Sequence, residues 1–134
     1  MKRQIGFREV LAGLYLILVC YLVFFGAFRQ GTNTEVHYIP FETTYELVTA
    51  HWNQTVWWMY FSVLGNFLLL FPIPFLFRMR WGGWKSVLMI ILIPLGIEST
   101  QYLLQVGSAD IDDVIFNTLG FAAGFGVNKL IKKK

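Results

Sequence analysis

A single charged residue, Glu98, interrupts an apolar run that extends from Ser86 to Leu104. As a helix, the run is long enough to cross the hydrocarbon core of a bilayer, which takes about 20 apolar residues. A carboxylate at that depth costs roughly 2.5–3.5 kcal/mol on insertion scales, so it needs a polar partner or a wet cavity. The run therefore predicts a membrane protein with a buried polar site around Glu98.

Three other segments are apolar enough to cross a membrane, and they complete a four-helix bundle. They are Val10–Phe28, Val56–Phe77 and Ile111–Ile131. Charged residues make up 14% of the chain, whereas soluble domains carry about 25%. We therefore expect an all-α, polytopic membrane protein whose single domain covers residues 1–134. The last segment opens with two aspartates, and a re-entrant hairpin is the alternative there.

The positions of the basic residues orient this bundle, because Lys and Arg concentrate on the cytoplasmic side of membrane proteins. In a four-span topology, ten of the 11 Lys and Arg residues fall on one side: Lys2, Arg3, Arg8, Arg78, Arg80, Lys85, Lys129, Lys132, Lys133 and Lys134. Both termini are therefore expected in the cytoplasm, and Arg29 lies on the outer side. These positions account for the net charge of +3, so the charge does not indicate nucleic-acid binding.

The outer loop after the first span contains a candidate element of its own. Phe41, Tyr45 and Val48 recur at helical spacing within Phe41–Ala50. This spacing predicts a short amphipathic helix lying at the membrane surface. An irregular connection is the alternative.

Polar residues in three of the spans fall on single helix faces, because residues three or four positions apart share a face. The stripes are Glu98, Gln101, Tyr102 and Gln105 in the third span, Asp113, Asn117, Gly120, Gly124 and Asn128 in the fourth, and Ser62 with Asn66 in the second. Counting from the span ends at about 1.5 Å per residue places Glu98, Asn117 and Asn66 in the outer half of the membrane. We expect Glu98 to face Asn117, with Asn66 completing the cluster.

An acidic rim formed by Asp110, Asp112 and Asp113 is expected above this cluster. The cluster and the rim together predict a polar cavity that opens to the outer face or the outer leaflet. Four neighbouring carboxylates repel each other unless a proton or a cation offsets their charge. A divalent cation is therefore compatible with the rim, although no dedicated metal site or cofactor is predicted.

Each of these residues also has a structural interpretation. Asn66, Gln101 and Asn117 would form interhelical hydrogen bonds worth about 0.6–2 kcal/mol each. Asp112 and Asp113 would cap the fourth helix, since carboxylates suit a helix N-terminus. The spacing Gly120-x-x-x-Gly124 lets another helix approach closely, and it is the contact expected in a homo-oligomer or a larger complex.

The order of these motifs resembles the VanZ-like family of bacterial membrane proteins, which is named for a teicoplanin-resistance protein. The matching pieces are Ile39-Pro40-Phe41, Gly65-Asn66 with Phe67–Pro72, Ile97-Glu98 with Gln101, and Asp110-Ile111-Asp112-Asp113 with Asn117, Gly120 and Gly124. The resemblance extends from the first span to the basic tail. It departs at Gly107-Ser108-Ala109, where many members carry an arginine.

The resemblance implies a multi-pass protein of the bacterial cytoplasmic membrane, connected with glycopeptide (teicoplanin) resistance and the cell envelope. One function is a resistance factor that binds an amphiphilic or lipid-linked ligand in the outer leaflet, among the membrane lipids. Its ligand-binding residues would be Asn66, Gln101, Asp110, Asp112 and Asn117.

Two other functions remain open. An intramembrane enzyme acting on a lipid-linked envelope substrate would use Glu98 as general acid and base, with Asp113 as the second catalytic carboxylate and a divalent cation held by the aspartates. An accessory subunit of a membrane complex would instead use the pair Gly120 and Gly124 as its contact.

Overall fold

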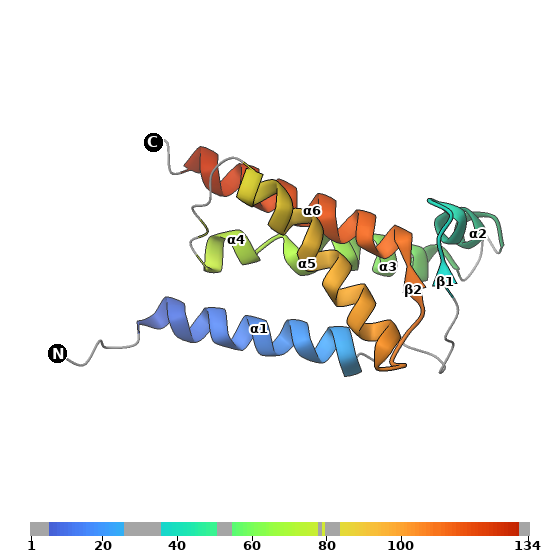
Figure 1. The fold of residues 1–134 in the computed structure, drawn as a ribbon, viewed down its shortest axis with the longest axis horizontal. Helices are drawn as coiled ribbons and strands as arrows, with labels where there is room; N and C mark the ends of the chain where they lie inside the picture. Colours follow the sequence, from blue (N-terminus) through green and yellow to red (C-terminus); the bar gives the residue numbers. More distant parts are fainter. Residues whose placement is uncertain (1–5, 26–35, 51–54, 78, 80–83, 132–134) are drawn as a thin grey trace.

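The chain folds into a mostly helical bundle whose long helices lie along one another (Figure 1). The fold comes from a computed structural model that describes residues 6–25, 36–50, 55–77, 79 and 84–131. The elements are α1 (Phe7–Phe25), β1 (Val36–His37), α2 (Glu42–Ala50), α3 (Thr55–Leu70), α4 (Ile73–Leu76), α5 (Trp84–Leu103), β2 (Ala109–Asp110) and α6 (Ile111–Ile131). Helices α1 and α5 run in one direction along the molecule, and α3 and α6 run in the other (Figure 1).

Three of these helices, α1, α5 and α6, are long and apolar enough to cross a membrane. Large hydrophobic side chains stay exposed along all three, as expected for surfaces that face lipid. Their bounds agree with the first, third and fourth spans expected from the sequence to within a few residues.

The second expected span, Val56–Phe77, is not one continuous helix. It is broken after Leu70 into the 16-residue α3 and the four-residue α4. Pro72 and Pro74 are the cause, because they lack the N–H groups that would bond to the carbonyls of Leu68 and Leu70. The segment expected as the second span is therefore built from two helices, α3 and α4.

Side chains from other helices bind the carbonyls that the break releases. The Tyr15 hydroxyl on α1 donates to the Leu69 carbonyl oxygen at 2.9 Å and lies 3.4 Å from that of Leu68. On the far side of the break, the Asn128 side chain donates to the carbonyls of Pro74, at 3.0 Å, and Met79, at 3.2 Å. Broken helices are tolerated in membranes where neighbouring side chains restore the lost bonds in this way.

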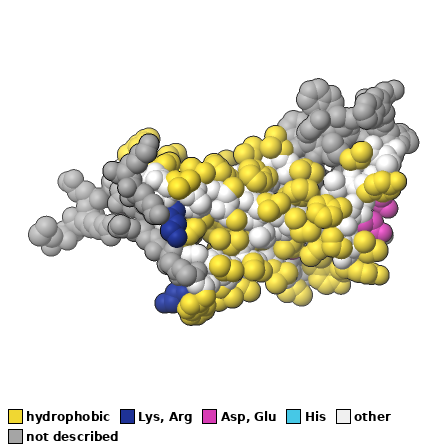
Figure 2. All heavy atoms as spheres, turned by 90° about the horizontal axis from the view of Figure 1, so that it is seen from above, with side chains coloured by type: hydrophobic (Ala, Val, Ile, Leu, Met, Phe, Trp, Pro, Cys, Tyr) yellow, Lys and Arg dark blue, Asp and Glu magenta, His cyan; other side chains and the backbone are white. Residues whose placement is uncertain are grey.

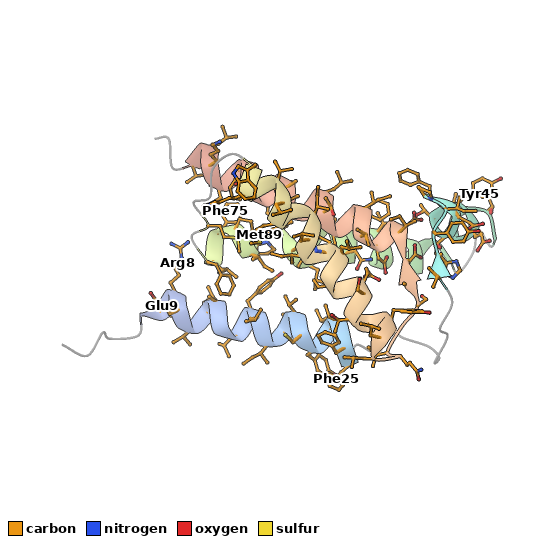
Figure 3. All side chains as sticks on the ribbon, viewed as in Figure 1. Arg8, Glu9, Phe25, Tyr45, Phe75 and Met89 are labelled. Atoms are coloured by element: carbon orange, nitrogen blue, oxygen red, sulfur yellow. The ribbon has the colours of Figure 1, made fainter. Side chains whose placement is uncertain are left out.

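A further donor reaches the same region from the start of α1. The Arg8 guanidinium donates to the Phe75 carbonyl oxygen at the end of α4, and Figure 3 shows Arg8 directed from the first turn of α1 toward Phe75. This places a cation at the C-terminal end of a helical turn, where the carbonyl dipoles favour it.

The parallel helices α3 and α6 approach each other closely along the glycine stripe of α6. A Cβ atom built on Gly120 would lie 1.8 Å from the Phe67 carbonyl oxygen, and one on Gly124 would lie 2.0 Å from that of Phe71. The two glycines are one helical turn apart, as are the two carbonyls they meet, so only residues without a side chain fit there. The close approach expected at Gly120-x-x-x-Gly124 is therefore made within the chain.

The apolar core lies beside this contact and toward one end of the bundle. It is formed by Leu70, Ile73 and Phe121, with Tyr15, Leu69, Met79, Ile90, Ile93 and Ile97 packed around it. This half also contains the starts of α1 and α5 and the end of α6, which carry Arg8, Lys85 and Lys129. We call it the basic end.

The opposite end, which we call the acidic end, contains α2, β1, β2 and the start of α6 (Figure 1). Strands β1 and β2 pair in parallel, with Val36 opposite Ala109 and His37 opposite Asp110. This small sheet, of two strands with two residues each, departs from the all-α expectation. The helix expected within Phe41–Ala50 is confirmed as α2, and its apolar residues Tyr45 and Val48 are exposed. On the face drawn in Figure 2, basic and acidic side chains lie at opposite ends.

Candidate functional site

Asp112 in the first turn of α6 caps α2, a helix that begins 70 residues earlier in the sequence. Its Oδ1 accepts from the Phe41 backbone N–H at 2.5 Å. Its Oδ2 accepts from the Thr44 backbone N–H at 2.9 Å and from the Thr44 hydroxyl at 2.7 Å. These are the donors that a helix N-terminus leaves unsatisfied, and Phe41 has no acceptor of its own to offer them.

Asp110 caps α6 itself. Its Oδ1 accepts from the Asp112 backbone N–H at 2.8 Å, which is the contact made by an N-cap residue. This role was expected of Asp112 and Asp113. The structure assigns it to the residue before the helix, because α6 begins at Ile111.

Asp113, the third member of the rim, contacts α3. The Asn66 side-chain amide donates to Asp113 Oδ1. Asn66 was expected to complete a cluster with Glu98 and Asn117, and the structure instead gives it a carboxylate partner at the start of α6. Three motifs that lie far apart in the sequence thus meet at the acidic end: the turn before α2, the Gly65-Asn66 pair and the aspartate run.

The polar face of α5 is shorter than expected. Glu98 and Gln101 are buried, whereas Tyr102 is 38% exposed and Gln105 lies beyond the end of the helix with a positive φ of 54°. The expectation that Gln105 extends the same face was wrong, because α5 ends at Leu103, whereas Tyr102 is within the helix and only partly exposed. Near this end of α5, the buried face carries two polar side chains one turn apart, Glu98 and Gln101.

Gln101 joins α5 to α1 and leaves an acceptor unused. Its Nε2 donates to the Val23 carbonyl oxygen at 2.8 Å. This bond determines the orientation of the Gln101 amide, because the flipped amide would place Oε1 against the Val23 carbonyl oxygen. Oε1 of Gln101 is buried and receives no hydrogen bond among the described residues.

Asn117 on α6 presents a second acceptor of this kind. Its side chain is 1% exposed, and its Oδ1 receives no hydrogen bond from the residues that the structure describes. A buried polar atom without a partner costs about 1–3 kcal/mol. Native structures seldom keep such atoms unless water, an ion or a ligand supplies the missing group.

Glu98 and Asn117 occupy similar positions along their helices, counted from the acidic end. Glu98 is 4% exposed and lies five residues before the end of α5 at Leu103, while Asn117 lies six residues after the start of α6 at Ile111. At about 1.5 Å per residue, Glu98 is about 7.5 Å and Asn117 about 9 Å from their helix ends. Both side chains are therefore inside the bundle, as expected, and their direct contact stays a prediction.

The acidic groups of this end do not gather as a metal site. Over the described parts of the chain, no three His, Cys, Asp or Glu side chains are placed to hold a metal ion. A divalent cation bound here would need ligands from elsewhere in the chain or from a bound molecule. Ser62 and Arg29, which were placed in the second span and on the outer side, have side chains outside the part of the chain that the structure describes.

Several residues that build this site escaped the sequence analysis. Thr44, Tyr15 and the backbone of Val23 contribute the bonds described above, and nothing in their local sequence marks them. Asn128 was placed on the correct face of α6, but its role in binding the carbonyls after Pro72 was not foreseen. The two prolines were the available signal, because each proline in a membrane helix leaves a carbonyl that needs a donor.

The glycine face of α6 is occupied within the chain. Gly120 and Gly124 are buried, Gly120 against Phe67 of α3 and Gly124 against Phe71 just after it. Contact with a second copy through these glycines stays a prediction.

Comparison with known proteins agrees with the motif pattern. Residues 12–132 match the VanZ/LLP1 family model, which covers nearly the whole chain. No curated protein and no solved structure matches the chain.

Proposed function

We propose that the chain, which belongs to the VanZ/LLP1 family, is a multi-pass protein of the bacterial cytoplasmic membrane that confers glycopeptide (teicoplanin-type) resistance. In this proposal α1, α3 with α4, α5 and α6 form four passages through the membrane. The acidic end faces outward, and it binds an amphiphilic or lipid-linked envelope ligand from the outer leaflet.

The distribution of charge supports this orientation. Arg8, Lys85 and Lys129 all belong to the basic end, and Lys and Arg favour the cytoplasmic side. With that end inside, α2 lies at the outer surface. Its exposed Tyr45 and Val48 suit a helix that lies in the interface between headgroups and acyl chains.

The observation that carries the proposal is the buried polar group of the acidic end. Glu98, Gln101 and Asn117 lie inside the bundle, within the part that would be at membrane depth. Gln101 Oε1 and Asn117 Oδ1 lack donors among the described residues. Polar residues at such depth are costly and usually mark a binding or transport site. Teicoplanin acts at the outer face and carries an acyl chain, so a ligand site in the outer leaflet suits resistance to it.

A second function is supported by the same carboxylate. Glu98 is buried within one turn of a Gln side chain, as a general acid and base acting on a lipid-linked substrate would be. Asp113 would be its catalytic partner. The contact between Asp113 and Asn66 would then serve to position the carboxylate.

Expression in a glycopeptide-susceptible host tests both functions. Glu98→Gln preserves shape and hydrogen bonding but removes the charge, and Asp113→Asn does the same at the rim. Both variants should reach the membrane at normal levels and lose most of the protection against teicoplanin. Glu9→Gln, the same chemical change at the basic end, should keep it.

The same assay with a glycopeptide that lacks the acyl chain shows whether protection depends on the amphiphile. If Glu98→Gln and Asp113→Asn both retain full resistance, the carboxylates are structural and the role of an accessory subunit replaces this proposal. Product formation from a lipid-linked substrate that stops in Glu98→Gln would favour the enzyme over the binding protein.

Topology is tested by single-cysteine labelling in a Cys20→Ala background. Thr34→Cys and Ser108→Cys should react with a membrane-impermeant maleimide from outside, and Trp81→Cys only after the membrane is permeabilised. Labelling of Ser108→Cys from the cytoplasm alone would contradict the orientation.

A further inference from the structure

We propose that the acidic end selects amphiphiles with a protonated amine in the headgroup, and that Gln101 Oε1 and Asn117 Oδ1 accept hydrogen bonds from that headgroup. This inference rests on the proposed function and names the chemical class of its ligand. Three features of the acidic end support it: its negative charge, its buried acceptors without donors, and an exposed apolar surface for the ligand's tail.

The charge of this end is negative throughout its described part. Glu42, Glu46, Glu98, Asp110, Asp112 and Asp113 lie within residues 36–50 and 98–113, and those two segments contain no Lys or Arg. The donors to Asp110 and Asp112 among the described residues are backbone N–H groups and a hydroxyl, all of them neutral, and Asn66 donates a neutral amide to Asp113. A region lined by charge of one sign raises the local concentration of the opposite ion.

Two side-chain amide oxygens inside this end are acceptors without a donor among the described residues, and the buried Thr43 hydroxyl of α2 has no partner there either. Oε1 of Gln101 and Oδ1 of Asn117 belong to side chains that are 3% and 1% exposed, and both oxygens lack a donor among the described residues. The bond from Gln101 Nε2 to Val23 leaves Oε1 as the group that remains for another molecule. An acceptor is satisfied by an N–H or O–H group, which an ammonium supplies three times over.

Glu98 adds the charge that distinguishes an amine from an alcohol. It lies one turn before Gln101 on the buried face of α5, at a position along its helix similar to that of Asn117, counted from the acidic end. A carboxylate and an ammonium that lose water together offset each other's cost, whereas an anionic headgroup would add a second negative charge. A lipid with a phosphate or carboxylate headgroup is therefore disfavoured, because its negative charge repels Glu98. A lipid with a hydroxyl headgroup can donate a hydrogen bond but cannot form an ion pair with Glu98.

The tail of such a ligand has an apolar surface to lie against. Phe25, Leu103 and Leu104 are 74%, 76% and 60% exposed where α1 and α5 end, beside the bond from Gln101 to Val23. A single chain can thus remain in the lipid while its headgroup enters the bundle. This arrangement is what makes the ligand an amphiphile and not a soluble amine.

The test uses the full chain in nanodiscs of zwitterionic lipid doped with one of three probes of equal chain length: hexadecylamine, hexadecanol or hexadecyl phosphate. Probe that stays with the protein after transfer to detergent is quantified by mass spectrometry. Hexadecylamine should be retained about tenfold over hexadecanol, and hexadecyl phosphate should be retained least. Glu98→Gln and Asn117→Leu should each bring hexadecylamine down to the level of hexadecanol, while Glu9→Gln leaves the ratio unchanged.

The outcomes separate this inference from the function on which it rests. If the three probes are retained equally, and above the level of bulk lipid, an amphiphile site exists and selection for an amine is wrong. If none is retained above bulk lipid, the proposed ligand site itself is wrong. If hexadecylamine is retained equally by the parent, Glu98→Gln and Asn117→Leu, its binding is a surface effect and the assignment of these two residues fails.

Discussion

Asn128 and Asn117 lie on the same face of α6, at opposite ends of the bundle, and their amide groups are used in opposite ways. At the basic end, Asn128 donates to the carbonyl oxygens of Pro74 in the short helix α4 and of Met79 beyond it. At the acidic end, Asn117 is equally well buried but keeps an acceptor without a donor among the described residues. The comparison distinguishes a buried amide that donates to backbone carbonyls from a buried amide whose oxygen has no donor among the described residues.

The contact of α3 with α6 holds both ends in register, so the largest expected effect comes from breaking it. Gly120→Ala or Gly124→Ala would place a methyl group within 2.0 Å of a carbonyl oxygen and force the helices apart. We expect a loss of about 1–3 kcal/mol or more, seen as a lower midpoint of thermal unfolding in detergent.

Gly126→Ala is the matched control for these variants. Nothing lies within 4 Å of a Cβ atom built at Gly126. Because alanine is favoured over glycine in a helix by about 0.5–1 kcal/mol, this change should be neutral or stabilising. Equal destabilisation by all three substitutions would contradict the close packing of α3 and α6.

The two asparagines are compared directly by changing each to leucine. Asn128→Leu leaves the carbonyls of Pro74 and Met79 without their side-chain donor, so it should cost about 1–3 kcal/mol of stability. Asn117→Leu removes an acceptor that is already unsatisfied, so it should cost less and should instead reduce resistance. Asn128→Leu should therefore lower the midpoint of thermal unfolding more than Asn117→Leu, and Asn117→Leu should lower teicoplanin resistance more than Asn128→Leu. If the same variant has the larger effect in both assays, the two asparagines do not differ in role.

Asp112→Ala is expected to act locally at the acidic end. It removes the acceptor of three hydrogen bonds at the start of α2, and loss of a cap costs about 0.5–2 kcal/mol. Hydrogen exchange should therefore accelerate in residues 42–50 while α5 and α6 stay protected. Unchanged exchange in α2 would show that the helix does not depend on this cap.

The smallest loss of stability is expected when the hydrogen bond from α1 to the carbonyl before the proline break is removed. Tyr15→Phe removes the bond to the Leu69 carbonyl oxygen and keeps the ring. Hydrogen bonds of this kind in membranes average about 0.6 kcal/mol and reach about 1.7 kcal/mol. If Tyr15→Phe lowers the midpoint of unfolding more than Asn128→Leu does, the hydrogen bond from α1 stabilises this region more than the hydrogen bonds from Asn128 on α6.

Periodicity and apolar length predicted the features that depend on neighbours in sequence. The bounds of α1, α5 and α6, the short helix α2 and the buried stripe with Asn117, Gly120 and Gly124 follow from spacing alone. The motif order was sufficient to recognise the family. These properties are local, because a helix face is fixed by residues three and four positions apart.

Contacts between distant segments could not be read in the same way. The capping of α2 by Asp112 joins residues that are 68 and 71 positions apart, and the parallel pairing of β1 with β2 involves two residues on each side. Neither leaves a periodic signal. The break after Leu70 was foreseeable in principle, because Pro72 and Pro74 lie in the sequence, but the apolar length of the segment outweighed them in the prediction.

If the acidic end faces outward and binds a cationic headgroup as proposed, the position of Glu98 brings the membrane potential into that binding. Glu98 lies five positions before the end of α5 at Leu103, which is about 7.5 Å of a hydrocarbon core about 30 Å thick. A monovalent cation at that depth has crossed about a quarter of the field, worth about 0.6 kcal/mol per 100 mV. Because the cell interior is negative, an energised membrane would draw a cationic headgroup inward and strengthen its binding about threefold. Collapse of the potential by an ionophore would release part of the ligand with no change in the protein.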